Sequence, residues 1–446
     1  MSKWNRPLNS ASHESLDLDD SDEAEPICSQ DANALKAAKR SSPSQVWTAE
    51  SKVLATGGTE IDVMEDLLHA KRTKKPKIPK RDKTQPLPRS LTPSSLPPPE
   101  SRILTLISVN VAGLRAVLRG QGAERLRTLV VREAPDVLCL NEHKLKEEDI
   151  AEAELGLRQL LPTEYATFHW SCSVMKKGYS GVAMIVRDAV AGGKAAITDP
   201  RSTKPCHGMG ASHEDDPIIT KEGRALTLEL PDLIVVSVYV PNAGQTLERH
   251  AYRVDRTGKH CWDRSLSEYI CSLKSSTNKP VVVIGDLNCG HQVLDIWNMY
   301  DRPDFPVELA AKNVPDQYTG LTSLKTSAGL TPEERISFSR LLVDSDLVDT
   351  FRAFHPQAVG VFSYFCQRAA QNRPMNKGLR IDYVLASSSL CAHLRPQPAV
   401  SHSSAFENAS SQTAALPRIH DSFILDQDEL IADHAAIGCH VLLPPQ

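Results

Sequence analysis

The chain has 446 residues and a formal net charge of -4 at neutral pH. This balance excludes a uniformly basic nucleic-acid-binding protein but not a local basic patch, and the length fits one large α/β domain plus a tail. No apolar run reaches about 18 residues, so we expect no transmembrane helix and no membrane partner. Ten cysteines stand singly, without the spacing of a zinc site, which is typical of reduced thiols in an intracellular protein.

The beginning of the chain differs from the rest in composition. Residues 1–100 are rich in Ser, Pro and charged residues and poor in aromatics. Such a segment cannot bury enough apolar surface to offset the entropy of ordering, so we expect a disordered N-terminal tail. Eight of the thirteen residues in 71–83 are basic, which fits a nuclear import signal, a contact with a phosphate backbone or a merely solvated tail. The acidic run 14–25 is unlike a mitochondrial presequence, and we expect nuclear residence, with the mitochondrion as the alternative.

The remaining residues, 101–446, are expected to form one folded domain. Strand-like apolar runs recur along it, at 103–109, 136–140, 181–186, 224–230, 233–240, 281–285, 380–386 and 435–443. Helical patterns lie between them at 124–132, 262–273 and 332–343. This mixture predicts mixed sheets with helices outside, an α/β sandwich. The polar stretches 192–221 and 393–428 are interpreted as insertions, and nothing in them identifies a chemistry.

A buried strand ends in a carboxylate and an amide at residues 286 and 288. The run Val281–Ile284 has no polar alternation, so we expect a strand covered on both faces whose tip carries Asp286 and Asn288. A desolvated carboxylate in that position suits cation binding or proton abstraction from water. The alternative is an Asx-type turn in which both side chains bond loop amides.

Polar groups follow other apolar strands in the same way. Asn110 and Glu142 each come after a strand, and Glu142 is either a ligand for a hard cation or a helix N-terminal charge. In the run VYVPNAG, Tyr239 and Asn242 could hold a phosphate oxygen, although a buried structural tyrosine is the ordinary alternative.

Two further groups stand near the C-terminus. Asp382 opens one strand, and Asp433 and His434 precede the last one. A histidine oriented and held charged by a carboxylate can stabilise the charge that develops on a reacting phosphate, and the alternative is a structural histidine.

Nine motifs in chain order carry a family resemblance. They are NVAGLRA, LCLNEHK, GYSGVAM, EGR, YVPNAG, GDLN, GLTPEER, RIDY and ADH, and they span about Ile103 to Leu443. Together they resemble the exonuclease III type of apurinic/apyrimidinic endonuclease, within the endonuclease/exonuclease/phosphatase superfamily. YVPNAG and GLTPEER separate this repair branch from the lipid and RNA phosphodiesterases of the superfamily.

The resemblance implies a fold and an activity for residues 101–446. The fold would be a four-layered α/β sandwich, in which two packed mixed β-sheets are flanked by helices. The activity would be magnesium-dependent hydrolysis of DNA 5′ to an abasic site, leaving a 3′ hydroxyl. The expected partner is double-stranded DNA that contains abasic sites or blocked 3′ ends, bound by a monomer.

The resemblance also assigns roles. The metal neighbourhood would consist of Asn110, Glu142 and Asp433. The groups acting on water or phosphate would be Asp286 and Asn288 on the water, Tyr239, Asn242 and His434 on the scissile phosphate, and Asp382 as the group that orients His434.

Two positions depart from the family pattern. The first motif usually carries an acidic residue two positions after its asparagine, and here that residue is Ala112. One metal-shell carboxylate is therefore missing, which predicts weaker magnesium binding or a shift toward manganese. The family commonly has Trp before the RIDY strand, where this chain has Leu379, so the pocket for a flipped-out sugar would rely on Tyr364 and Phe365 as aromatic walls.

Three basic residues in or beside the motifs are candidate phosphate contacts. These are Arg115, Lys144 and Arg249, each of which could equally be a solvent-exposed side chain. A 3′-phosphodiesterase or 3′-phosphatase activity is expected beside incision. The alternative functions are another phosphodiesterase of the superfamily, acting on 5′-tyrosyl DNA, RNA or phosphoinositides, and a DNA-binding module that has lost catalysis, which Ala112 keeps open.

Overall fold

The structure is a computed structural model that describes residues 92–93, 102–188, 206–209, 215–299, 327–394, 416–425 and 429–444. Every described helix and strand belongs to the compact unit Ile78–Gln446. The basic segment 71–83, and all of the predicted tail except residues 92–93, lie outside the described residues. Within the described ranges, no helix combines the length and the hydropathy needed to cross a membrane.

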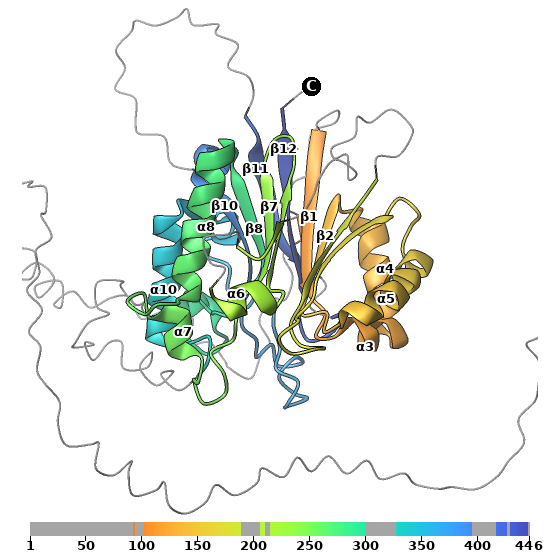
Figure 1. The fold of residues 1–446 in the computed structure, drawn as a ribbon, viewed down its shortest axis with the longest axis horizontal. Coiled ribbons are helices and arrows are strands. Elements are labelled where there is room, and N and C mark those ends of the chain that lie inside the picture. The colour runs from red at the N-terminus through yellow and green to blue at the C-terminus, as the bar shows by residue number, and fades with distance from the viewer. Residues whose placement is uncertain are drawn as a thin grey trace, which may run out of the picture. The chain divides into compact units, whose positions relative to one another are not determined.

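Two six-stranded sheets form the centre of this unit (Figure 1). The first has the order β11-β12-β1-β2-β4-β3. Its strands are β1 Arg102–Asn110, β2 Val137–Asn141, β3 Thr167–Ser171, β4 Val182–Val186, β11 Arg418–Leu425 and β12 Ala436–Leu443. β1 and β2 pair in parallel, and the other neighbours pair antiparallel, so the sheet is mixed as predicted.

The second sheet repeats this design. Its order is β5-β6-β7-β8-β10-β9, with β7 and β8 in parallel and the other pairs antiparallel. Its strands are β5 Cys206–His207, β6 Ala225–Glu229, β7 Ile234–Tyr239, β8 Val281–Asp286, β9 Leu347–Asp349 and β10 Asp382–Ser387. All six residues of β8 are buried, which confirms a strand covered on both faces.

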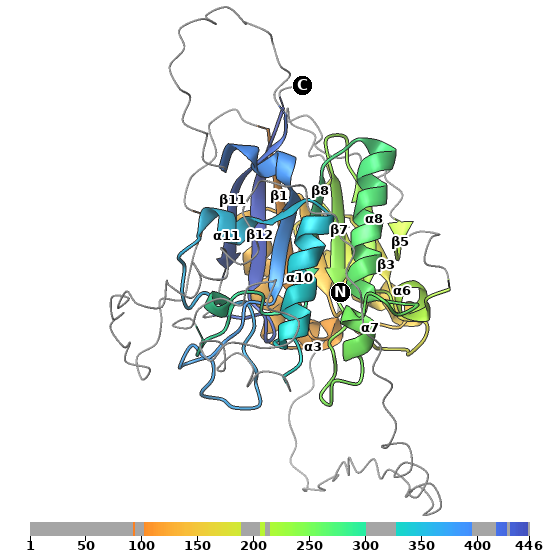
Figure 2. The ribbon, with the colours of Figure 1, turned by 90° about the vertical axis from the view of Figure 1, so that its left-hand side faces the viewer.

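Helices cover the outer face of each sheet, which confirms the four-layered sandwich (Figures 1 and 2). One apolar cluster lies between the sheets, and one lies under each helical layer. The helices beside the first sheet are α3 Leu114–Arg119, α4 Gly122–Glu133 and α5 Ile150–Leu160. Those beside the second include α7 His250–Val254, α8 Trp262–Thr277 and α10 Pro332–Asp344. Three of the helices, α7, α6 Pro217–Lys221 and α11 Thr350–Phe354, have only five residues each. Three short 3-10 segments complete the elements, η2 Glu147–Asp149, η4 Val293–Asp295 and η7 Ser388–Leu394.

The interpretation of residues 393–428 as an insertion is wrong for its last part. Arg418–Leu425 is the edge strand β11, and it pairs with β12 along its length. Asp421 interrupts the apolar alternation of this segment, and the pairing register also shifts there. The sequence pattern therefore did not indicate a strand. The end of the stretch 192–221 likewise contains the short elements β5 and α6.

The parallel pairs direct their C-terminal ends to one end of the sandwich. Asn110 lies opposite Asn141 at the ends of β1 and β2, and Tyr239 lies opposite Asp286 at the ends of β7 and β8. β10 runs the other way, so its first residue, Asp382, lies opposite Asp286. The residues that the sequence places after strands therefore converge there, at the lower end in Figure 1.

Candidate active site

Asp286 ends β8 and is 1% exposed. Its Oδ1 accepts a hydrogen bond from the backbone N–H of Asn288 at 2.8 Å, and its Oδ2 accepts one from Nδ2 of Asn110 at 3.0 Å. Burial and the neighbouring charge of Asp382 raise the pKa of Asp286 to about 7. The Asx-type turn is thus present, and the second oxygen belongs to a carboxylate that can accept a proton near neutral pH.

Two amides lie beside this carboxylate. Nδ2 of Asn242 donates to Oδ1 of Asn288 at 3.0 Å, and Nδ2 of Asn288 donates to the Val240 carbonyl at 2.9 Å. The Oδ1 atom of Asn242 accepts from the Gly244 N–H, where a positive φ of 92° suits glycine. Both amides are therefore oriented by the loops that follow β7 and β8.

His434 and Asp382 form a buried pair. Nδ1 of His434 lies 2.8 Å from Oδ2 of Asp382, and the two residues are 4% and 3% exposed. Burial alone would lower the pKa of His434, but the carboxylates of Asp382 and Asp286 outweigh it and raise this pKa to about 10. The imidazole is therefore a cation at neutral pH. One potential ligand atom from each of these three residues lies within 4.8 Å of the others.

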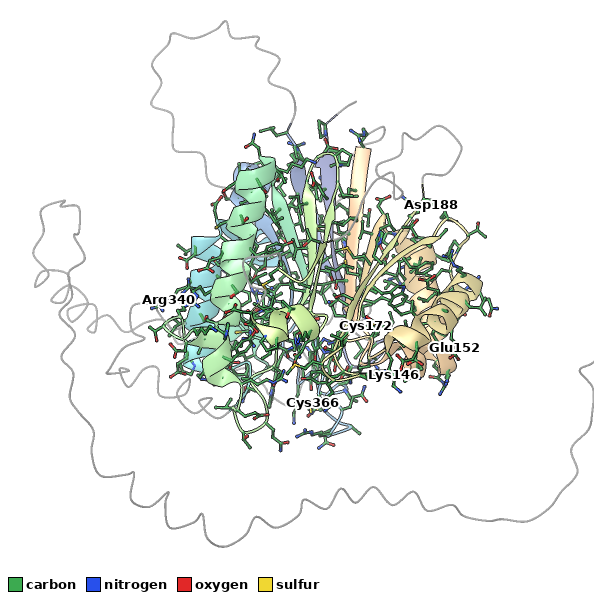
Figure 3. The ribbon with its side chains drawn as sticks, in the orientation of Figure 1. Lys146, Glu152, Cys172, Asp188, Arg340 and Cys366 are labelled. Atoms are coloured by element: carbon green, nitrogen blue, oxygen red, sulfur yellow. The ribbon has the colours of Figure 1, made fainter. Side chains whose placement is uncertain are left out.

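A cavity of about 530 Å³ opens onto these groups. The predicted residues that line it are Glu142, Tyr239, Asn242, Asp286, Asn288, Tyr364, Asp433 and His434. Gln245, Cys366, Arg368 and Leu379 also line it, and sequence reasoning did not assign Gln245, Cys366 or Arg368. Cys366, labelled in Figure 3, lies at the lower end of the sandwich. The structure thus brings eight of the predicted site residues to one cavity, with Asn110 and Asp382 directly behind them.

Two carboxylates of this cavity fit a hard divalent cation. Oε2 of Glu142 accepts from Nδ2 of Asn110 at 3.0 Å. Among the described residues, Oδ1 of Asp433 has no hydrogen-bond partner although it is shielded from solvent, and a bound cation would satisfy such an atom. Oδ1 of Asn110 accepts from the Ala112 N–H at 2.9 Å, so its N–H groups face the carboxylates. Asn110 therefore donates to both Glu142 and Asp286, and its place in the metal neighbourhood stays a prediction.

Tyr239 is 9% exposed and lies on a buried cation. The guanidinium of Arg224 is 4.8 Å from the centre of its ring. Burial, followed by the charges of Glu142 and Asp286, raises the pKa of Tyr239 well above its usual value. Tyr239 therefore stays a phenol and can donate a hydrogen bond into the cavity.

Comparison with known proteins identifies the family. The profile described as "Endonuclease/Exonuclease/phosphatase family" matches residues 107–404. This chain belongs to that family. It is 32% identical over 287 residues to the DNA repair nuclease APEX1 of Danio rerio, covering 64% of this chain and 74% of the relative. It is also 32% identical over 287 residues to an exodeoxyribonuclease of Bacillus subtilis, covering 64% and 89%.

A solved structure agrees with this membership. The AP endonuclease LMAP from Leishmania major superposes with a TM-score of 0.57 at 27% identity, over 85% of this chain and 99% of that one. The resemblance to the exonuclease III type of this family is therefore confirmed.

In this family member, the candidate DNA contacts are distributed unevenly. Tyr364 lines the cavity with its ring 4.9 Å from that of His434, whereas Phe365 is 2% exposed and packs edge-on against Phe362 in the core. Phe365 thus forms no wall of the pocket. Two candidate phosphate contacts are in ion pairs away from the lining: Arg115 with Asp149 at 2.9 Å, and Arg249 with Glu222 at 3.1 Å.

A buried charge network supports the cavity from behind. The Arg253 guanidinium donates to the carbonyls of Leu287 and Asn288, and it lies 3.4 Å from Oε1 of Glu334. Oε2 of Glu334 accepts from the N–H of Gly329, in the cavity wall, at 2.7 Å. Sequence reasoning missed this role of Arg253, because an arginine in a short helix usually faces solvent. The T-x-x-E pattern could have located Glu334 as a capping residue.

Proposed function

We propose that this chain incises DNA 5′ to abasic sites by hydrolysis, leaving a 3′ hydroxyl, as the endonuclease of base-excision repair. Family membership and the DNA repair nuclease and AP endonuclease names of its relatives support the reaction class. The observation that carries the proposal is the convergence of Asp286, Asp382 and His434 within 4.8 Å at a cavity of about 530 Å³. A base and a cation poised together suit attack of water on a phosphate diester.

In this proposal, Asp286 takes the proton of the attacking water. Its raised pKa lets it accept that proton at neutral pH. Asn288, which is fixed by the Val240 carbonyl, positions the water. The His434 imidazolium, held by Asp382, stabilises the negative charge that grows on the phosphate oxygens.

Two more side chains would bind the scissile phosphate. Tyr239 and Asn242 line the cavity from the end of β7 and the loop after it, and both carry hydrogen-bond donors. The donors are held before substrate arrives, because sheet pairing fixes the backbone of Tyr239 and the Gly244 N–H donates to the side-chain oxygen of Asn242. Such preorganisation lowers the reorganisation needed during reaction.

A divalent cation would be held by Glu142 and Asp433, with Asn110 fixing Glu142. When bound, it would neutralise phosphate charge and help the leaving oxygen depart. Carboxylate oxygens favour magnesium, and the missing acid at Ala112 leaves manganese as a possible substitute. We further propose that the enzyme acts as a monomer in the nucleus, with mitochondrial residence as the alternative.

Incision of a duplex with one abasic site, in magnesium, tests the function. Wild type is expected to cut on the 5′ side, and Asp286→Asn to be slower by a factor of about 10² to 10⁴. Asp344→Asn, on an exposed residue of α10, is the matched control and should cut like wild type. Absence of cutting by wild type, or full cutting by Asp286→Asn, would overturn the proposal.

A second activity at 3′ ends is favoured by the exodeoxyribonuclease relative. We propose that the same cavity removes 3′-phosphate and 3′-phosphoglycolate groups, since the same water and phosphate groups would act. A substrate panel that adds 5′-tyrosyl DNA, RNA and a phosphoinositide would distinguish this activity from those of other phosphodiesterases in the superfamily. Binding of abasic DNA with no turnover of any substrate would instead indicate a module that has lost catalysis.

A further inference from the structure

Lys144 occupies one oxygen of the metal-site carboxylate. Its Nζ lies 2.9 Å from Oε1 of Glu142, while Oε2 of Glu142 accepts from Nδ2 of Asn110 at 3.0 Å. Both oxygens of Glu142 therefore have partners, and a cation on Oε1 would compete with the ammonium, because two positive charges on one oxygen repel each other. Figure 3 labels Lys146, from the same loop, at the lower end of the sandwich.

The backbone of this loop is fixed, so the exchange falls to the Lys144 side chain. Glu142 and Lys144 have φ values of 56° and 52°, and the Lys144 N–H donates to the Ser180 carbonyl at 2.9 Å. The buried ring between them, His143, accepts from the Leu145 N–H at 3.0 Å. The Lys144 side chain is 40% exposed against 20% for Glu142, so it can rotate toward solvent while Glu142 stays in place.

Residue 112 adds no second acid beside Glu142. The first motif of the family usually has an acidic residue there, and here it is Ala112, whose backbone N–H donates to Oδ1 of Asn110. Among the described residues, Glu142 is the acid that the Lys144 ammonium contacts. One cationic side chain and one incoming cation thus compete for one carboxylate.

We propose that Lys144 couples DNA binding to metal binding, by releasing Glu142 to the cation when a DNA phosphate takes its ammonium. The inference rests on the proposed function, because it requires a phosphate at this cavity. By linkage, the cation strengthens DNA binding by the same factor as DNA strengthens cation binding. For an ion pair that is partly exposed, the contribution of Lys144 to this factor is on the order of 5-fold.

The test measures cation affinity directly, with Ca²⁺ as the probe because it binds oxygen ligands with flexible geometry. Titration calorimetry is run on the full chain, alone and with an abasic duplex, and a gel of the recovered DNA checks that it stays intact. The variants are Lys144→Gln, Lys144→Arg and Lys177→Gln. Lys177 is the matched control, since it forms a similar pair with Glu148 at 3.0 Å, and Glu148, unlike Glu142, does not line the cavity.

Without DNA, Lys144→Gln should bind Ca²⁺ about 5-fold more tightly than wild type. The factor by which DNA raises the Ca²⁺ affinity should be about 5-fold smaller in this variant than in wild type. Lys144→Arg and Lys177→Gln should behave like wild type. Free Lys144→Gln that binds Ca²⁺ no more tightly than wild type, or an unchanged effect of DNA, would overturn the inference. The free-enzyme arm uses no DNA, so it separates this failure from a failure of the proposed function, which the incision assay reports.

Discussion

Replacing Arg253 with methionine should damage both the stability and the turnover of the enzyme. Arg253 is 1% exposed, and its guanidinium lies near the carboxylates of Glu334, at 3.4 Å, and Asp263, at 3.8 Å. Methionine keeps an apolar stem but carries no charge, so both buried carboxylates would lose the cation nearest to them. Removing one partner from a buried ionic group costs about 3–5 kcal/mol.

The same substitution removes two donors from the loop after β8. The carbonyls of Leu287 and Asn288 would lose their hydrogen bonds from Arg253, the latter at 2.6 Å. Because Asn288 is the proposed water-positioning group, we expect kcat to fall roughly 10-fold while KM changes little. At a temperature where the variant is folded, such a split indicates the loss of an interaction made only in the transition state, not the loss of substrate binding.

Urea unfolding and steady-state incision check both effects. Arg256→Met is the matched control, since Arg256 pairs with Asp344 at the surface, at 2.6 Å and with 24% and 43% exposure. That pair should contribute less than about 1 kcal/mol. Two results would rule out this role of Arg253: a loss of stability in Arg253→Met no larger than in Arg256→Met, or a loss of stability with kcat unchanged at a temperature where the variant is folded.

Three further predictions concern the cavity and the core. Arg368 is an exposed residue that lines the cavity and has no partner among the described residues. Arg368→Gln should therefore raise KM for abasic DNA about 3-fold or more and lower the slope of log KM against log salt by about 0.9. An unchanged slope would contradict this prediction. Ala112→Asp should lower the magnesium concentration for half-maximal incision about 10-fold, because it adds a carboxylate to the metal site. Asp tolerates the positive φ of 46° at this position. An unchanged magnesium concentration for half-maximal incision would contradict this prediction. Asp295 is buried between Arg380 and Arg352, whose charges outweigh burial and hold its pKa well below the usual range. The stabilisation from ionised Asp295 is present above the unfolded pKa of about 3.9 and is lost as pH falls toward the lower folded pKa. Urea unfolding should therefore show Asp295→Asn about 3–5 kcal/mol less stable than wild type at pH 7, with a smaller difference at pH 3. The same difference at both pH values would contradict this prediction.

Sequence reasoning located the strand-end groups because burial and strand ends leave a clear pattern. Asp286 follows an unbroken apolar run, and a polar group at the tip of a buried strand has few other places to lie. The direction in which a single side chain points was harder to predict from the sequence. Tyr364 and Phe365 are adjacent in an extended segment, so they point to opposite sides, one to the cavity and one to the core. No composition rule distinguishes which of the two faces inward.

Contacts between distant segments could not be predicted. The Arg253 side chain reaches carbonyls 34 and 35 residues further along the chain, and Glu334 81 residues further. The amide orientation of Asn110 likewise depends on the Ala112 N–H and on Asp286, 176 residues away. Such contacts exist only once the two sheets have packed, and a single sequence records none of these distances.

In the proposed mechanism, Asp286 activates a water molecule that attacks the phosphate 5′ to the abasic site. Incision in H₂¹⁸O under single-turnover conditions, followed by mass spectrometry of both fragments, tests it most directly. We expect one ¹⁸O atom in the 5′-terminal phosphate of the fragment with the abasic sugar and an unlabelled 3′ hydroxyl on the other fragment. Asp286→Asn should form much less of both products. Cleavage on the 3′ side without ¹⁸O, as in β-elimination, would contradict it.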